Sequence, residues 1–216
     1  MLKSQILSGD SLIKNPVTPR VDQMIRKYSK GYSLDAGCGS GSYLSSFNGT
    51  VVGVDIRSKI LQQAKKRKRI YLVLCSITHL PFKNQTFNFI LFSEVIEHFV
   101  DCDAKQALRE IERTSKGVIL VDTPNTAFFL EFIRKILYGN WIYDARRITK
   151  VPMQHKSLWN KKKLLNEGFI VKGCLGWMTY RKLRWKKLAH VIDSVSWKNP
   201  SIAGTLIGIK GSHLDS

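Results

Sequence analysis

The order of apolar and polar residues predicts strands and helices that alternate along the first 125 residues. Short apolar runs rich in β-branched residues are typical of strands buried on both faces, and apolar residues three or four apart indicate amphipathic helices. Strands are expected at 32–36, 50–56, 70–75, 87–93 and 118–122, and helices at 18–30, from 42 onward, at 59–69 and at 103–115. Thr18 and Ser58 stand where helix caps are preferred.

This alternation predicts an α/β fold with a mainly parallel sheet, right-handed crossovers and helices on both faces. A further helix is expected at 157–167, capped by Ser157, and two more strands at 169–174 and 205–210. Residues 126–151 mix aromatic and basic side chains and are interpreted as an insertion. The chain is therefore expected to form a single domain over 1–216, with an N-terminal helical segment at 1–30.

Composition limits the classes of protein that fit. The 216 residues include 35 Lys and Arg against 16 Asp and Glu, giving a formal charge of +19. No apolar run approaches the roughly 18–20 residues that cross a bilayer, and the first residues lack the apolar stretch of a secretory signal. A soluble, cytoplasmic protein is expected. The charge fits a nucleic-acid partner, an anionic membrane surface or a solvated exterior, and composition does not choose among them.

The four cysteines are scattered along the chain, at Cys38, Cys75, Cys102 and Cys174. No two of them have the short spacing of structural zinc sites, so no metal site is predicted. In a reducing compartment they are expected to be free thiols.

A glycine-rich segment carries the strongest functional signal. It runs from Leu34 to Gly41 with the sequence LDAGCGSG, so its glycines follow the end of the first predicted strand. A phosphate-binding P-loop would end in Gly-Lys-Ser/Thr, and a dinucleotide fingerprint would need glycine at position 42, which is Ser42. Asp35 beside the loop would repel a pyrophosphate but suits a ligand with an ammonium group.

A second acid, Asp55, ends the second predicted strand. An acid that ends the second strand, about 20 residues beyond Asp35, can accept hydrogen bonds from ribose hydroxyls. An ammonium group together with an adenosine ribose describes S-adenosyl-L-methionine (SAM), which is the predicted cofactor.

Several motifs in order extend this prediction. They are LDAGCGSG at 34–41, GVD at 53–55, LPF at 80–82, FNFI at 87–90, EVIEH at 94–98 and EGF at 167–169. In these motifs the chain resembles the class I SAM-dependent methyltransferases, particularly the broad group that contains the quinone-biosynthesis methyltransferases. The resemblance covers roughly residues 30–125. It implies a Rossmann-like three-layer sandwich with a seven-stranded, mainly parallel sheet whose last strand is antiparallel.

The resemblance also implies roles for individual residues. Asp35 would lie near the methionine ammonium, Asp55 would hold the ribose, and Ser93 would lie near the methionine part. Ser76 and Ile77 take the adenine position, where the family usually has Asp in place of Ser76. The expected cofactor-binding set is Asp35, Gly37, Cys38, Gly39, Gly41, Asp55, Ile56, Ser76, Ile77 and Ser93.

No catalytic residue is assigned from the sequence. The sulfonium is already activated, so methyl transfer needs a general base only where the acceptor must lose a proton. Candidates for that role are His98, His155, Glu94 and Glu97. For each histidine a structural role is the alternative.

The basic segments bear on the methyl acceptor. Residues 65–69 are all basic and lie at a predicted helix end, where cations are favoured by the helix dipole. Residues 161–163 are all lysine, and segment 181–187 is rich in Lys and Arg around Leu183 and Trp185, with Trp177, Tyr180 and Trp197 nearby. Basic residues interleaved with aromatics suit RNA or an anionic membrane.

The insertion favours an apolar acceptor. Phe128, Phe129, Phe132, Ile136 and Leu137 recur at near-helical spacing, as in a lid or a membrane-contacting helix, or in a helix packed on its own domain. We therefore expect a methyltransferase acting on a small or lipid-like molecule. The alternative is an RNA methyltransferase or an RNA-binding protein of the same fold. The chain lacks the Asn/Asp-Pro-Pro-Tyr/Phe signature that many amino-methylating nucleic-acid enzymes carry after strand four.

Overall fold

A computed structural model describes residues 18–64, 69–125, 156–174 and 186–211. The predicted N-terminal segment 1–17, the insertion at 126–151, His155 and the basic residues 181–185 lie outside these ranges. Within the described residues, no helix is long and apolar enough to cross a membrane.

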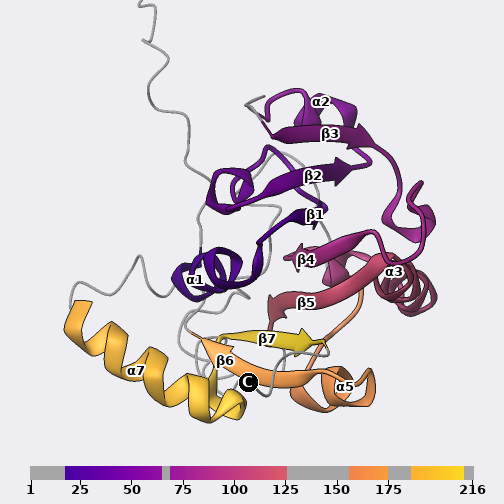
Figure 1. Ribbon diagram of the computed structural model, residues 1–216. Coiled ribbons are helices and arrows are strands. Elements are labelled where there is room, and N and C mark those ends of the chain that lie inside the picture. The colour runs from indigo at the N-terminus through magenta and orange to yellow at the C-terminus, as the bar shows by residue number, and fades with distance from the viewer. Residues whose placement is uncertain (1–17, 65–68, 126–155, 175–185, 212–216) are drawn as a thin grey trace, which may run out of the picture.

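A seven-stranded sheet forms the centre of the molecule (Figure 1). Its order is β3-β2-β1-β4-β5-β7-β6, and the first five strands along the chain run parallel while β7 is antiparallel to both of its neighbours. The strands are β1 (Tyr32–Ala36), β2 (Thr50–Asp55), β3 (Ile70–Leu74), β4 (Phe87–Ser93), β5 (Ser115–Pro124), β6 (Ile170–Cys174) and β7 (Thr205–Lys210). The prediction of a mainly parallel α/β sheet with an antiparallel last strand is confirmed.

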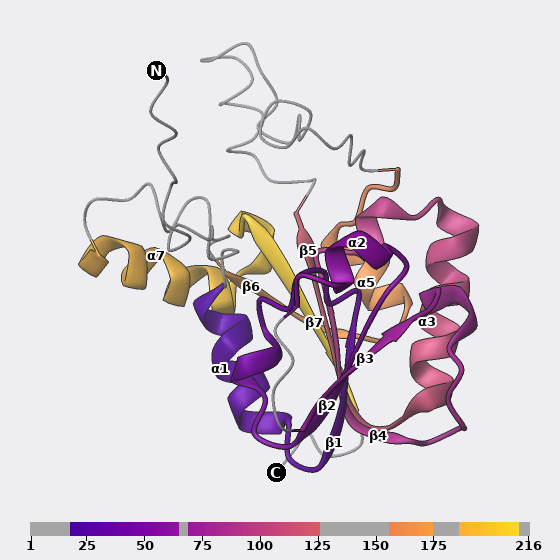
Figure 2. The same ribbon diagram turned by 90° about the horizontal axis from the view of Figure 1, so that it is seen from above.

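Helices cover both faces of the sheet (Figure 2). One face carries α3 (Asp101–Thr114) and α5 (Lys161–Asn166), whose apolar residues join a core with Trp159 and the even-numbered side chains of β4, Ile90 and Phe92. The other face carries α1 (Pro19–Tyr28), whose apolar residues join a core with Phe89 and Leu91 of the same strand. Helix α7 (Lys186–Lys198) lies on this face against β6, and its Trp197 packs against the same core. Alternate residues of β4 therefore feed two separate cores, which explains its continuous apolar run.

Short elements connect the layers. A four-residue helix, α2 (Ser58–Leu61), packs on β2 and β3. The described ranges also contain four turns of 3-10 helix between the strands: η1 (Leu44–Ser46), η2 (Ile77–His79), η3 (Ile96–His98) and η5 (Pro200–Ile202). The four cysteines all lie in the described ranges and are unpaired, as expected, with Cys38 and Cys174 buried and Cys102 exposed.

Helix α2 ends at Leu61, so the helix predicted at 59–69 is wrong at 62–64, while residues 65–68 lie outside the described ranges. Arg69 directly precedes β3, and its carbonyl already accepts the N–H of Val51 in β2 at 2.9 Å. Ser58 is the first helical residue and not its cap; Arg57 takes the cap position and makes no side-chain cap bond.

Two other helix predictions need correction. The helix expected from Ser42 is only the 3-10 turn η1, and α5 begins at Lys161 because Asn160, not Ser157, caps it by accepting from the Lys163 N–H at 2.9 Å. Thr18 holds the cap position of α1 as predicted, but it makes no side-chain cap bond; its N–H donates to the Tyr43 hydroxyl at 3.0 Å.

Helix α7 was not predicted, because its apolar pattern is inverted. Val191 and Val195 are exposed, whereas Asp193 and Ser196 are buried. The buried Asp193 pairs with Arg20 of α1, whose guanidinium also lies 5.2 Å from the Trp197 ring centroid. A polar contact between two helices therefore sets the orientation of α7, and hydrophobic periodicity does not reveal it.

Candidate functional site

The glycine loop lies at the carboxyl end of β1 and is fixed to the end of β2. The N–H groups of Gly37 and Cys38 both donate to the Val54 carbonyl, at 2.8 and 2.9 Å. The Gly39 N–H donates to Oδ2 of Asp55 at 3.0 Å, and the Gly41 N–H closes a turn on the Cys38 carbonyl at 2.8 Å. The loop and the second acid, which lie 16 residues apart in sequence, are thereby held in contact.

Two glycines show why this loop requires glycine. Gly37 has φ of +85°, and a Cβ there would lie 2.5 Å from Cγ2 of Val95, so a side chain has no room. Gly39 has φ of +54°, but a Cβ there would meet nothing closer than the Arg57 guanidinium at 3.9 Å. The backbone at Gly39 therefore lines an open cradle that a side chain would fill, which suits close approach of a ligand to the main chain.

Asp35 lies in β1 beneath this loop and is 3% exposed. Burial, and then the nearby carboxylates of Asp122 and Asp55, raise the pKa of Asp35 to about 8. Its Oδ2 accepts no hydrogen bond from any residue in the described ranges. A buried carboxyl oxygen without a donor is costly, and a cationic ligand group would relieve that cost.

The pKa of the second acid, Asp55, is shifted in the opposite direction from that of Asp35. Burial acts to raise its pKa, but hydrogen bonds from Arg57 and Gly39 outweigh burial and hold the pKa of Asp55 below its usual range. Arg57 donates from Nε to Oδ1 at 3.0 Å and from a terminal nitrogen to Oδ2 at 3.1 Å. Asp55 is therefore an ionised acceptor beside the loop.

The remaining predicted residues lie at the same edge of the sheet. Ile56 follows β2 and is 69% exposed, so it offers an apolar surface next to Asp55. The end of β3 is tied to β2 by the Cys75 N–H, which donates to the Asp55 carbonyl at 3.3 Å. Ser76 follows directly and accepts the Thr78 N–H at 3.3 Å, while the Ile77 side chain is buried in the core and leaves only its backbone for a ligand.

Cys38 and Ser93 complete the predicted set. The Cys38 side chain is buried over Gly53, where a Cβ would lie 2.8 Å from its sulfur, and burial raises the pKa of the Cys38 thiol above its usual range. Cys38 therefore packs the loop onto β2. Ser93 ends β4, which lies between β1 and β5 in the sheet, and it is paired in register with Asp122 of β5.

Residues 34–120 match the family model described as a methyltransferase domain. The match begins at the strand that carries Asp35 and ends in β5, so it includes the glycine loop, both acids and the Ser76 turn. This chain contains a class I SAM-dependent methyltransferase domain. The cofactor of such a domain is SAM, and the open cradle at Gly39 and the unpartnered Asp35 oxygen fit a ligand that carries an ammonium group.

Three curated relatives extend over part of the chain. An uncharacterized protein of Methanocaldococcus jannaschii is 34% identical over 140 residues, which is 62% of this chain and 54% of the relative. The malonyl-[acyl-carrier protein] O-methyltransferase of Hamiltonella defensa is 37% identical over 48% of this chain and 42% of its own length. A probable tRNA methyltransferase 9B of Bos taurus is 30% identical over 47% of this chain and 23% of its own length. The chain thus spans about half the length of the first two relatives.

A solved structure supports the fold over nearly the whole chain. The SAM-dependent methyltransferase from Archaeoglobus fulgidus aligns with a TM-score of 0.57 and 18% identity, covering 89% of this chain and 93% of that one. At this identity the likeness is evidence for the fold only.

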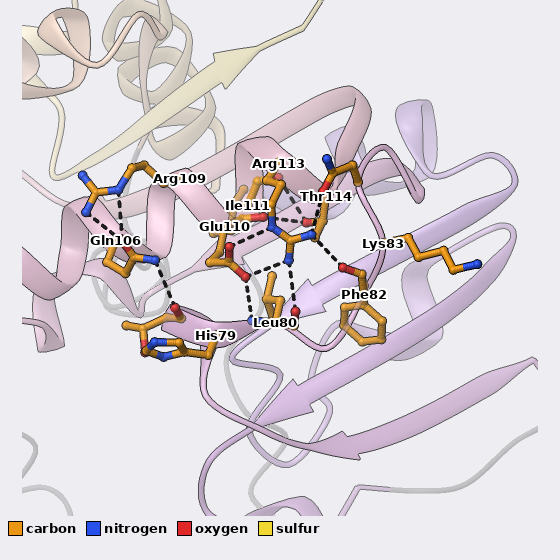
Figure 3. Close-up of polar contacts among 12 residues, drawn as sticks. His79, Leu80, Phe82, Lys83, Gln106, Arg109, Glu110, Ile111, Arg113 and Thr114 are labelled. Carbon is orange, nitrogen blue, oxygen red and sulfur yellow. Dashed lines mark hydrogen bonds and ion pairs between the residues drawn. The ribbon is translucent and has the colours of Figure 1, made fainter.

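In this methyltransferase domain, α3 holds the loop that follows the Ser76 turn (Figure 3). The guanidinium of Arg113 donates to the carbonyls of Phe82 and Leu80, at 2.7 and 3.0 Å, and Oε2 of Glu110 accepts the Leu80 N–H at 2.8 Å. Gln106 donates to the Thr78 carbonyl at 3.3 Å. These contacts fix the segment from Thr78 to Phe82, and with it the position of Ser76.

Of the four candidate bases, Glu94, Glu97 and His98 lie in the described residues after β4, and His155 does not. Glu97 is 2% exposed, accepts from the Thr123 hydroxyl at 3.0 Å, and its carbonyl accepts the Ser157 N–H at 3.1 Å. Burial raises the pKa of Glu97 and that of its neighbour Glu94. Glu97 therefore joins η3 to the segment after residue 155. His98 is partly exposed at the end of η3, and His155 lies outside the described residues.

Two site residues were missed by sequence reasoning. Arg57 precedes the predicted helix cap, and nothing in the sequence indicates that it pairs with Asp55. Asp122 was read as the end of the fifth strand; it is fully buried within β5, and burial raises its pKa. An acid in a run of buried strand residues is itself unusual, and this signal marks Asp122 in the sequence. In the described ranges, no three His, Cys, Asp or Glu side chains are placed to hold a metal.

Proposed function

We propose that this protein transfers a methyl group from SAM to a small or lipid-like acceptor. The observation that carries the proposal is the contact between the glycine loop and Asp55, with Asp35 buried below it. SAM supplies a methyl group already activated by its positively charged sulfur. The residues of the chain bind and orient the cofactor, and positioning of the two reactants supplies much of the rate acceleration.

The predicted binding residues contact different parts of the cofactor. Asp55 accepts hydrogen bonds from the ribose hydroxyls, and the backbone at Gly39 lies against the ligand. Asp35 faces the ammonium group, whose positive charge favours ionisation of that carboxyl. Ile56 and the backbone at Ser76 and Ile77 contact the adenine, and Ser93 lies near the methionine part. No catalytic base is assigned.

The choice of acceptor rests on two observations. A relative with 37% identity over 112 residues is a malonyl-[acyl-carrier protein] O-methyltransferase, whose named acceptor carries a malonyl group and is not a nucleic acid. In the basic segment 161–163, Lys163 is already engaged within the chain: it pairs with Asp101 at 2.6 Å and lies 4.3 Å from the Trp159 ring centroid. This leaves fewer cations of that segment for phosphates.

RNA is the second candidate acceptor, favoured by the net charge of +19 and by the tRNA methyltransferase relative. The cytoplasm remains the predicted location, and an anionic membrane surface remains a predicted partner for a lipid acceptor.

The test combines cofactor binding with methyl transfer. S-adenosylhomocysteine (SAH) should bind the purified full chain in calorimetry and raise its melting temperature through mass action. Tritiated-methyl SAM is then incubated with the protein and a fractionated cell extract, with Asp55→Asn as the background control. We expect label in the lipid or small-molecule fractions. Label in RNA would replace the proposed acceptor, and absence of both SAH binding and methyl transfer would refute the methyltransferase activity.

A further inference from the structure

The carboxylate of Asp55 has no acceptor position left for a ribose. Oδ1 accepts from the Arg57 N–H at 2.8 Å and from Arg57 Nε at 3.0 Å. Oδ2 accepts from the Gly39 N–H at 3.0 Å and from an Arg57 terminal nitrogen at 3.1 Å. A carboxylate offers about four acceptor sites, and these four contacts fill them.

The four contacts are of two kinds. The donors at Gly39 N–H and Arg57 N–H belong to the backbone, which the loop and the end of β2 hold in place. The other two come from the Arg57 side chain, which is 42% exposed and can rotate into water, whereas the Asp55 side chain is only 4% exposed. A ribose diol needs two acceptor sites on Asp55, and only the guanidinium can vacate them.

The guanidinium also occupies space at the loop. Of the atoms around Gly39, a terminal nitrogen of Arg57 is the nearest to a Cβ built on that residue, at 3.9 Å. Arg57 therefore lies across the cradle between Gly39 and Asp55. It stands at the cap position of α2 but makes no side-chain cap bond there, so the helix does not account for its side-chain placement.

We propose that Arg57 is a displaceable positioning residue. In the free protein its guanidinium donates to both oxygens of Asp55 and so occupies the ribose position. A ligand with a free 2′,3′-diol must displace it. This inference rests on the proposed use of SAM. The two backbone donors keep the Asp55 carboxylate oriented after the guanidinium leaves. Arg57 thus lowers the affinity for nucleoside ligands, because each binding event breaks a charge-assisted pair.

The inference is tested by calorimetry with Arg57→Met, which keeps the length of the side chain but removes its charge and donors. The matched control is Arg109→Met, because Arg109 is an exposed arginine of α3 that donates to Gln106 on the same helix. Three ligands are compared at one pH and salt concentration: SAH, adenosine and 2′,3′-dideoxyadenosine. Melting temperatures without ligand verify that both variants are folded.

We expect Arg57→Met to bind SAH and adenosine at least threefold more tightly than the wild type. Its affinity for dideoxyadenosine should equal that of the wild type. Arg109→Met should match the wild type with all three. If the wild type binds SAH and Arg57→Met binds it equally or more weakly, the inference about Arg57 is overturned, whereas the proposed use of SAM still stands. The same gain for dideoxyadenosine would overturn displacement by the diol. Failure of every variant to bind SAH at millimolar concentration would instead refute the proposed function, and the inference with it.

Discussion

Arg113 and Glu110, one turn apart on α3, form an ion pair at 2.8 Å that holds the loop at residues 80–82 from both sides of its backbone (Figure 3). Arg113 donates to two of its carbonyls, and Glu110 accepts one of its N–H groups. The pair itself is partly exposed, so its value lies in satisfying backbone groups of a loop that has no secondary structure of its own.

Replacing Arg113 by Met should therefore destabilise the protein by about 1–3 kcal/mol, since two backbone carbonyls lose their donors. Urea denaturation measures the loss, and amide hydrogen exchange at 78–82 should accelerate. Arg109→Met, on the same helix, should stay within about 0.5 kcal/mol of the wild type. An Arg113→Met protein as stable as the Arg109→Met control would contradict this role.

Gly39→Ala separates folding from ligand binding. Its Cβ has room in the free protein, so the main cost is the positive φ, about 1–2 kcal/mol. The same Cβ fills the cradle, and SAH affinity in calorimetry should fall at least roughly tenfold, or about 1.4 kcal/mol. Gly37→Ala should instead damage folding, because its Cβ would lie 2.5 Å from Val95. Unchanged SAH binding by Gly39→Ala would exclude the cradle as the ligand site.

Asp55→Asn should weaken SAH binding by roughly tenfold or more, because an amide accepts at only one of its two ends and carries no charge. Asp22→Asn is the matched control. Asp22 also pairs with an arginine, Arg26 at 2.8 Å, but lies on α1 away from the loop. The comparison is made by calorimetry at one pH. If the two variants bind SAH equally well, Asp55 does not hold the ribose.

The free protein should lose stability as the pH rises from about 4 to 8. Burial raises the pKa of Asp35 to about 8 in the folded state, from an ordinary value of 3.8 in the unfolded chain. Between these values the folded state binds the extra proton, so the free energy of unfolding falls by up to about 1.4 kcal/mol per pH unit from this group. Above pH 8 its contribution no longer changes.

Urea titrations from pH 5 to 9 test this dependence. Asp35→Asn should unfold with a shallower pH slope than the wild type and be the more stable of the two at pH 8. Asp22→Asn should leave the slope unchanged, because Arg26 and Ser46 outweigh burial and hold the pKa of Asp22 below its ordinary value. A slope in Asp35→Asn as steep as that of the wild type would show that Asp35 does not contribute to it and that other buried acids with a raised pKa, such as Asp122 and Glu97, account for the dependence.

All seven strands were predicted from the sequence, whereas the helices were predicted less well. A strand buried on both faces reads as an apolar run wherever it lies, and each strand here is within two residues of its prediction at both ends except β5, which extends further at its start. Helix α2 ends at Leu61 and Arg69 is already paired with Val51 of β2, and α7 buries Asp193 in place of its valines. Both outcomes depend on contacts with distant parts of the chain.

The sequence by itself determined the strands, the glycine loop and the two acids, since each depends on local pattern: runs of apolar residues, positive φ at glycine, and an acid at a strand end. Only the tertiary structure decided how those acids are used. It places other carboxylates near Asp35, and it brings the Arg57 guanidinium to the acceptor positions of the Asp55 carboxylate. It also holds the loop at Leu80 through Arg113, 33 residues away. Burial and pairing between distant segments set charge and geometry, and residue spacing carries no record of them.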